Sequence, residues 1–576
     1  MQGCLQPSFT TFAAIGIALK KLLYLILLFP LGISGQAVSL EILADDTRSA
    51  TVIDSVGYSK LHPDALSAQK HTADFVSQLR NAGWLAARTV RDTLQGAVLK
   101  SWVSIGPRAK NIHIYIGSDP IIKQAIQGSR NDSVSMPVSS VEAFLNRTLA
   151  KLESMGYPLS VLQLGRISAT GDNLQADLIS QPGTRRQVND IVINGYDKFP
   201  AGHRKQVARL YRNKSVSNDN LRAINGEFAK FRFVTQTRYP EILFTTDTTR
   251  VFVYLEKAKA NRFDGFIGFS NDDEQDGGKV RFNGYLDLLL VNILNTGEEF
   301  SLFWKSDGRD QKTFDAGITL PYIFKSPFGL KASLNIFRQD STFQNTRTAI
   351  GLGYFFNYNT RLYLGYEATE SSDIQNAQTS SVSDYKNSFA TGTLEFTAYK
   401  AEDFLFPEKS RAMLKSGFGK RNSATGDDAQ WFLEAMAMHN FYLGERNIIN
   451  LRTHNYYLSS ERYLVSELFR FGGIRSVRGF NENSLQASLT TSLLSEYRYV
   501  LAPGLYLHSI ADYAYYRDQS RDIGTGNSGS LLGLGFGFGL LTNNGLFNLV
   551  YANGTPDGQA IKLSNSIVHI SFQAKF

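Results

Sequence analysis

The chain has 576 residues, too many for one ordinary soluble domain, so several folding units are expected. With 48 glycines, 12% aromatic and 43% hydrophobic residues but only 15 prolines, the composition favours strands and turns and excludes collagen, a disulfide framework and a wholly disordered chain. The net charge is +8, but acidic residues are interspersed with the basic ones, so no basic stripe for nucleic acid is seen and no nucleic-acid partner is expected. The charge indicates little else about partners.

Residues 1–36 have the pattern of a secretory signal peptide. Two lysines, an apolar run and two small residues follow one another in this order: Lys20, Lys21, Leu22–Ile33, Ser34 and Gly35. Residues 5–19 are also rather apolar, so a single amino-terminal anchor helix is the alternative. Cleavage after the signal would remove Cys4, the one cysteine of the chain, and the mature protein would need no disulfide bond in an oxidising compartment.

Residues 38–260 combine amphipathic helices with short strands in an order that repeats. One helical stretch ends at Gly83 and a second, Val141–Met155, ends at Gly156, and each is followed by two strands and a turn of glycine and proline. These strands are expected at Ala87–Thr93, Ala97–Ile105, Val161–Ala169 and Leu174–Ser180. A third copy is expected as a strand, two helices and two strands: Asp190–Asn194, from about Ala201, from about Asn218, Glu241–Thr245 and Thr249–Glu256. The pattern predicts three units, each a small sheet covered by two helices, over residues 38–108, 110–184 and 186–258; unrelated α/β segments are the alternative.

From residue 263 to residue 576 the helical period gives way to alternating apolar and polar residues, as in Arg281–Leu288 and Glu299–Lys305. About sixteen such segments of roughly ten residues fit this length, and apolar-out, polar-in strands are what a membrane β-barrel requires. Short turns are expected at Asn295–Gly297, Asn357–Asn359, Ala502–Gly504 and Asn543–Gly545, and longer polar loops at Asn271–Gly278, Glu370–Asn387, Arg421–Asp428 and Arg517–Ser528. The predicted fold is therefore a set of α+β repeats followed by a transmembrane antiparallel β-barrel of about 16 strands; a water-soluble β-sandwich is the alternative.

A glycine-rich stretch, Phe471–Phe480, lies between two of the predicted strands. Its three glycines allow sharp turns and close packing. Arg478 lies between the apolar Val477 and Phe480, so its guanidinium group needs an acidic partner in this setting. The alternative is a hairpin loop that carries one surface arginine.

Together these features resemble the BamA/TamA superfamily of outer-membrane assembly proteins, the bacterial surface antigen family. The resemblance rests on the POTRA-like repeats, the sixteen-strand barrel, the motif Val477-Arg478-Gly479-Phe480 and the terminal Phe576. It implies that this sixth outer loop folds back into the lumen, where Arg478 meets acidic residues of the next two strands. The matching positions are Glu496 and Asp512, and alternation independently gives both a lumenal orientation. Solvated charges in a wide lumen are the alternative.

The sequence departs from the family pattern at one position. The family usually has glycine two residues after the strand-thirteen aspartate, whereas this chain has Ala514. Close packing of the sixth loop at that point is therefore in question.

The resemblance implies an outer-membrane protein assembly or translocation factor, closest to the TamA-like branch because three repeats are expected. The repeats would capture unfolded client strands by edge pairing. The barrel would open at a seam between its first and last strands, marked by Gly265, Gly268, Phe572 and Phe576. Glycines would weaken such a seam, but ordinary barrel packing explains them equally well.

This interpretation implies certain partners, and other functions are its alternatives. The expected partners are unfolded outer-membrane clients and outer-membrane lipid, and a periplasmic or inner-membrane partner protein is left open. The main alternative is a two-partner-type secretion pore that exports one dedicated protein; a passive porin explains the repeats less well. No H-E-x-x-H or G-x-S-x-G motif occurs, so neither an enzyme nor a cofactor or metal site is expected.

Overall fold

The computed structural model describes residues 37–575 except for 45, 127–131, 272–279, 307–310, 340–341, 375–382, 401–402, 404, 425, 521–526, 543–544, 557–558 and 560–565. The predicted signal peptide and Phe576 lie outside the described residues. The chain divides into two compact units between Arg185 and Arg186. In the described part, none of the helices is both long and apolar enough to span a membrane.

The first repeat is a four-stranded sheet with two helices. Its elements are β1 (Val38–Ala44), α2 (Thr47–Val56), β2 (Leu61–His62), α3 (Ala65–Asn81), β3 (Arg88–Gln95) and β4 (Val98–Ser104). The strand order is β2-β1-β4-β3, with β1 parallel to β4. Asp46 and Asp64 begin the helices, because each carboxylate accepts a hydrogen bond from an otherwise unpaired backbone N–H of the first turn. Apolar residues of both helices and of β1 and β4 form one core.

The second repeat has the same strand order. Its elements are β5 (Asn111–Tyr115), α4 (Pro120–Ala125), β6 (Ser133–Pro137), η1 (Val138–Ser140), α5 (Val141–Ser154), β7 (Val161–Thr170) and β8 (Asn173–Gln181), in a sheet β6-β5-β8-β7. Ala109 donates a backbone hydrogen bond of 2.8 Å to the carbonyl oxygen of Gly83, where the first repeat meets the second. A side chain at Gly83 would collide with the Ala109 carbonyl, so this junction requires glycine.

The third repeat has a three-stranded sheet, one strand fewer than the first two repeats, and belongs to the same compact unit as the barrel. It comprises β9 (Asp190–Asn194), α6 (Ala201–Tyr211), α7 (Asn218–Phe228), β10 (Val234–Phe244) and β11 (Thr249–Lys257). The sheet order is β10-β11-β9, with β9 parallel to β11. β10 begins seven residues before the predicted Glu241, because two register shifts between Gln236 and Glu241 interrupt the alternation from which the strand was predicted.

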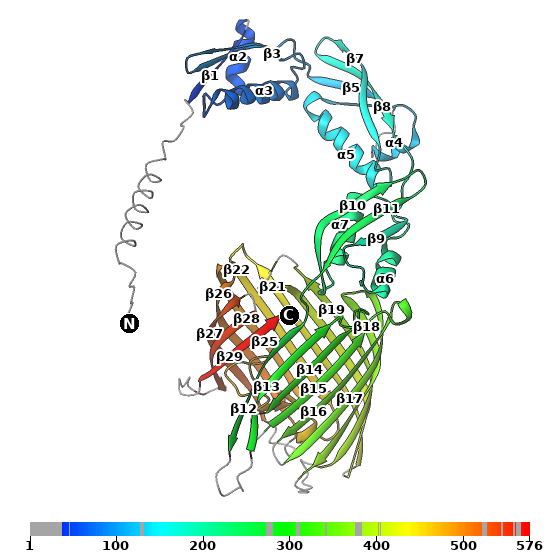
Figure 1. The fold of residues 1–576 in the computed structure, drawn as a ribbon, viewed down its shortest axis with the longest axis vertical. Coiled ribbons are helices and arrows are strands. Elements are labelled where there is room, and N and C mark those ends of the chain that lie inside the picture. The colour runs from blue at the N-terminus through cyan, green and yellow to red at the C-terminus, as the bar shows by residue number, and fades with distance from the viewer. Residues whose placement is uncertain are drawn as a thin grey trace, which may run out of the picture. The chain divides into compact units, whose positions relative to one another are not determined.

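Sixteen antiparallel strands then close into a barrel, which confirms the predicted fold class (Figure 1). They are β12 (Arg262–Asn271), β13 (Val280–Val291), β14 (Glu299–Ser306), β15 (Gln311–Leu320), β16 (Phe328–Gln339), β17 (Phe343–Asn357), β18 (Thr360–Asp373), β19 (Tyr385–Tyr399), β20 (Glu408–Ser423), β21 (Gly426–Tyr442), β22 (Asn447–Ser459), β25 (Leu489–Ala502), β26 (Leu505–Asp518), β27 (Asn527–Thr542), β28 (Gly545–Pro556) and β29 (Ser566–Lys575). A short 3₁₀ turn, η3 (Ile323–Lys325), lies between β15 and β16.

The prediction of one long loop is wrong. Residues 421–428 were expected to form a long polar loop, but β20 and β21 continue through them and pair as far as Ser423 and Gly426. Polar residues here belong to strand ends that carry a buried charge cluster, so polarity alone does not separate strand from loop in this region.

Side chains on the barrel strands alternate between two environments. On β25 and β26, Leu493, Tyr497, Leu507 and Tyr513 are exposed on the outer face. The residues between them, including Ser492, Glu496, His508 and Asp512, are buried. This alternation gives an apolar surface toward lipid and a polar lumen.

The third repeat packs on the turns at one rim of the barrel. Its residues Phe228, Phe231 and Phe233 share one apolar core with Tyr322 and Tyr358 of the barrel turns. Polar contacts supplement this core: the side-chain amide of Gln206 donates to the carbonyl oxygen of Lys325 at 2.8 Å, and Arg232 donates to Glu408 at 2.9 Å. The third repeat and the barrel are therefore joined by a packed interface.

Candidate functional site

The glycine-rich stretch lies in a long connection between β22 and β25, residues 460–488, which we call loop six. Loop six contains η4 (Val465–Glu467) and a small hairpin of β23 (Phe469–Phe471) and β24 (Leu485–Ala487). Phe471, Val477 and Ala487 of the loop pack with Leu494 and other apolar residues of β25, β26 and β27 in one buried cluster. An outer loop of this length is thus folded against the inner wall of the barrel.

Arg478 lies at the centre of a buried charge cluster. Its Nε donates to Asp512 Oδ2 at 2.7 Å, its Nη2 donates to Asp512 Oδ1 at 2.5 Å, and its backbone N–H donates to Asp512 Oδ2 at 3.0 Å. Its Nη1 donates to Glu496 Oε1. The exposed fractions of Arg478, Glu496 and Asp512 are 2%, 7% and 0%. The structure therefore brings together the arginine and the two carboxylates that the sequence suggested, with a bidentate pair to Asp512.

Two further arginines, which the sequence interpretation missed, also contact Glu496. Arg452 Nη2 donates to Glu496 Oε1 at 2.7 Å, and Arg498 Nε donates to Glu496 Oε2 at 2.7 Å. Arg452 lies on β22 and Arg498 on β25, both on the lumenal face. Alternation along β25 puts Arg498 on the same face as Glu496, but this signal does not by itself identify an ion pair, and alternation gives no such link for Arg452 on β22.

Loop six approaches the barrel wall so closely that both the loop and the wall need glycine where they touch. Gly479 has φ +88°, and a side chain there would collide with the backbone of Asn553 and Gly554 on β28. A side chain at Gly533 on β27 would collide with the carbonyl of Arg478. Asp512, Gly533 and Gly554 are directly paired across β26, β27 and β28, so they form one row beneath the loop.

Ala514, where the family pattern has glycine, is fully buried and contributes to the apolar cluster around Val477. In this chain the glycines that admit the loop backbone are Gly533 and Gly554, on the next two strands. The departure at Ala514 thus leaves the close approach of loop six intact.

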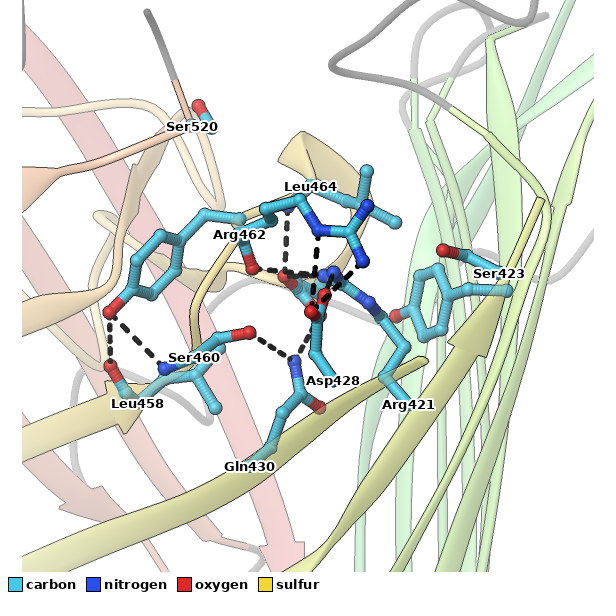
Figure 2. A network of polar contacts seen from close by, with 12 residues as sticks. Arg421, Ser423, Asp428, Gln430, Leu458, Ser460, Arg462, Leu464 and Ser520 are labelled. Carbon is cyan, nitrogen blue, oxygen red and sulfur yellow. Dashed lines mark hydrogen bonds and ion pairs between the residues drawn. The ribbon is translucent and has the colours of Figure 1, made fainter. Parts of the chain in front are cut away.

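A second buried arginine holds the beginning of loop six (Figure 2). Arg421 on β20 is fully buried and pairs with Asp428 on β21 and with Glu467 of the loop, its Nη1 lying 2.5 Å from Glu467 Oε1. Gln430 donates to Glu467 Oε2 at 2.9 Å, and Arg462 of the loop donates to Asp428 Oδ1 at 3.0 Å. The sequence interpretation also missed this cluster, and two of its residues, Arg421 and Asp428, bound the segment that was predicted to be a long polar loop.

The barrel closes between β12 and β29. Within the described residues these strands pair at three positions, Arg262–Lys575, Phe263–Ala574 and Asp264–Gln573. Every other neighbouring pair of barrel strands is matched at eight or more described positions. The seam is therefore the least extensively paired junction of the described barrel.

The predicted seam residues have different surroundings. Gly265 follows the last seam pair, and a side chain there would meet the Tyr285 carbonyl of β13 at 2.5 Å, so its glycine is explained by packing against β13. Gly268 pairs with Asn283 of β13, and Phe572 pairs with Phe547 of β28. Phe576 lies outside the described residues.

A cavity of about 910 Å³ lies in the lumen behind the seam. Its lining includes the seam pair Asp264 and Gln573, together with Arg478 and Glu496. The loop-six cluster and the seam therefore border one lumenal chamber.

Comparison with known proteins finds solved structures that are similar to this chain in fold. No protein-family model and no curated protein matches the chain. Among solved structures, it is similar to BamA from Haemophilus ducreyi lacking POTRA domains 1–3, with 13% identity over 80% of this chain and 99% of that chain and a TM-score of 0.46. It is also similar to CdiB from Acinetobacter baumannii (15% identity) and from Escherichia coli (16% identity), each over 88% of this chain and 97% of that chain with a TM-score of 0.49.

In the described structure, three α/β repeats precede a closed sixteen-strand barrel. Identities this low do not transfer residue roles, so the role of each site residue is argued from its own contacts.

Proposed function

We propose that this protein assembles client proteins into the outer membrane, with the β12–β29 seam as the place where a client strand pairs. The observation that carries the proposal is the short pairing at that seam. Beyond Asp264, β12 has no described partner on its β29 side, so its backbone N–H and C=O groups can pair with another strand. Strand addition to a sheet edge depends on main-chain hydrogen bonds and therefore tolerates many client sequences.

The repeats offer edges of the same kind. β3, β7 and β10 each lie at the end of their sheet order. Each also carries exposed large apolar side chains, which are Val90, Leu94, Val161, Ile167, Tyr239 and Leu243. An extended, partly apolar client segment could add to these edges in a sequence-tolerant way before it reaches the barrel.

Arg478 and Arg421 have a supporting role in this proposal. Arg421 pairs with Glu467 of loop six, and Arg478 of loop six pairs with Asp512 of the wall, so that the loop occupies the barrel interior while the seam is closed. Val477, Gly479 and Phe480 complete the anchor by packing and close approach. The proposal involves no catalysis.

A disulfide across the seam tests the mechanism. Phe263 and Ala574 are paired across β12 and β29, so cysteines at these positions lie directly opposite each other at the seam. Oxidation of Phe263→Cys/Ala574→Cys should stop assembly of outer-membrane clients in cells, and reduction should restore it. The matched control is Leu549→Cys/Ile570→Cys, which links β28 to β29 at a paired position away from the seam and should leave assembly unchanged. Full assembly with a verified seam disulfide would refute seam insertion.

The alternative is a secretion pore that exports one dedicated protein through the lumen. The cavity behind the seam is the observation that favours it. Depletion of the protein separates the two functions: loss of many outer-membrane proteins supports assembly, whereas loss of a single exported protein supports secretion.

A further inference from the structure

The tip of loop six contacts the first strands of the barrel as well as the last ones. Arg475 Nη2 pairs with the carboxylate of Asp287 on β13, and its guanidinium lies 4.9 Å from the ring centre of Phe303 on β14. Seven residues later, Glu482 pairs with Lys305 on β14 at 3.5 Å. Asp287 in turn accepts a hydrogen bond of 3.2 Å from Arg262, the first residue of β12.

The same tip is fixed to the other side of the seam. Arg478, three residues after Arg475, is bonded to Asp512 on β26, and Gly479 lies against the backbone of β28. In the closed barrel β12 and β29 are neighbours, so β13 and β28 flank the seam on its two sides. Loop six therefore crosses the seam on the lumenal side. The cavity behind the seam is lined by Arg475 and Glu482 as well as by the seam pair.

The two attachments differ in burial. The Arg478 side chain is 3% exposed and its partner Asp512 is 0% exposed. The Arg475 side chain is 62% exposed, although Asp287 is only 10% exposed. Exposed ion pairs contribute little and break readily, whereas breaking a buried pair leaves an uncompensated charge. The attachment to β13 is thus the one that gives way when the two sides separate.

We propose that the tip of loop six is a latch across the seam, with Arg475 as its releasable contact and Arg478 as its fixed end. This inference rests on the proposed function, since it assigns the control of seam opening to Arg475 and Asp287. Separation of β12 from β29 moves β13 and its neighbour β14 away from the loop. This movement breaks the Arg475–Asp287 pair and the weaker Glu482–Lys305 pair, while the loop stays with β26–β28. Arg475 is a positioning residue, because it acts on the closed seam and contacts no reacting group.

The test measures seam closure directly, without clients. The full chain carries Phe263→Cys/Ala574→Cys and Cys4→Ser, and this purified protein, with its repeats, is equilibrated in a glutathione redox buffer. The equilibrium constant for the seam disulfide then reports the population of the closed seam. Arg475→Ala should lower this constant about two- to fivefold, the range expected for one exposed ion pair. Arg475→Glu should lower it further through repulsion of Asp287, and Arg475→Lys should restore most of it.

The matched control is Lys386→Ala, which removes an exposed ion pair with Glu370 on β18 and β19, away from loop six and the seam. It should leave the disulfide constant unchanged. Equal constants for Arg475→Ala, Arg475→Glu and the parent would overturn the latch, even if the locked seam still blocked assembly. Conversely, a lowered constant combined with full assembly by the locked protein would support the latch as a structural contact and refute seam insertion.

Discussion

Among the described residues of the lumenal cluster, Arg478 and Asp512 share the largest number of hydrogen bonds, three. Glu496 has two further arginines, Arg452 and Arg498, whereas the described side-chain hydrogen bonds to Asp512 all come from Arg478. Removing Arg478 would therefore leave Asp512 as a buried charge without its cation, while Glu496 would stay compensated. The two carboxylates of the cluster thus differ in what they require from the loop.

We predict that Arg478→Ala lowers the free energy of unfolding of the barrel by about 3–5 kcal/mol, less where lumenal water reaches the site. Arg478→Lys should recover only part of this loss, because lysine lacks the bidentate fork. Adding Asp512→Asn to Arg478→Ala should recover more stability than adding Glu496→Gln. A double-mutant cycle on the denaturant midpoint measures the coupling, and additive effects of Arg478 and Asp512 would rule out the anchor.

The glycine row beneath the loop gives a second prediction. Gly533→Ala should lower barrel stability by about 1–3 kcal/mol, because the new methyl group displaces the Arg478 carbonyl and the loop with it. Gly351→Ala is the control, since an alanine on β17 meets Tyr363 Cβ at an ordinary 3.6 Å. Similar melting temperatures for the two variants would mean that loop six does not depend on close approach to β27.

At the scale of elements, the interface between the third repeat and the barrel is built around a buried histidine. His203 on α6 is fully buried against the rings of Phe231, Phe233, Tyr322 and Tyr358. In the described structure neither ring nitrogen has a hydrogen-bond partner. Burial, together with the nearby Arg361 charge, lowers the pKa of His203 to about 3. The interface therefore requires the neutral imidazole.

Acidification should weaken this interface. The free imidazole has a pKa near 6.5, so between pH 6.5 and about 3 the separated state binds a proton that the packed state does not bind. The free energy that favours the packed interface over the separated state should therefore fall by about 3 kcal/mol as the pH falls from 7 to 4. Hydrogen exchange of α6 and α7 at both pH values measures the loss. His203→Leu should abolish the pH dependence, and an unchanged dependence in that variant would assign it to other groups.

The sequence predicted elements whose periodicity is continuous and missed those that depend on distant partners. The helix Val141–Ser154 and most barrel strands follow regular apolar spacing, and alternation placed Glu496 and Asp512 on the lumenal face. Local spacing carries no signal for Arg421 with Glu467, which are 46 residues apart and meet only after loop six folds inward. The short strands and helices at the start of the first two repeats were likewise not resolved individually, because segments such as α4 are too brief to establish a period.

At the scale of the whole molecule, the compact units do not coincide with the division into repeats and barrel. The first two repeats form one unit, and the third repeat is grouped with the barrel. The shared aromatic core explains this grouping, since Phe231 and Phe233 pack directly with Tyr322 and Tyr358. The third repeat is thus part of the folded barrel unit in physical terms, even though its own fold repeats that of the others.

Two truncations test this division. Deleting residues 38–185 should leave a barrel unit that keeps its heat-dependent gel mobility and melts near the temperature of the full chain, but that assembles clients poorly because two repeats are missing. Deleting residues 38–260 should also expose the barrel side of the core, including Tyr322, Phe355 and Tyr358. Large apolar side chains contribute about 1.5–3 kcal/mol each when buried, so this barrel should be less stable by several kcal/mol. Equal melting temperatures for the two truncated proteins would contradict a shared core, and full client assembly by either would show that edge capture by the deleted repeats is dispensable.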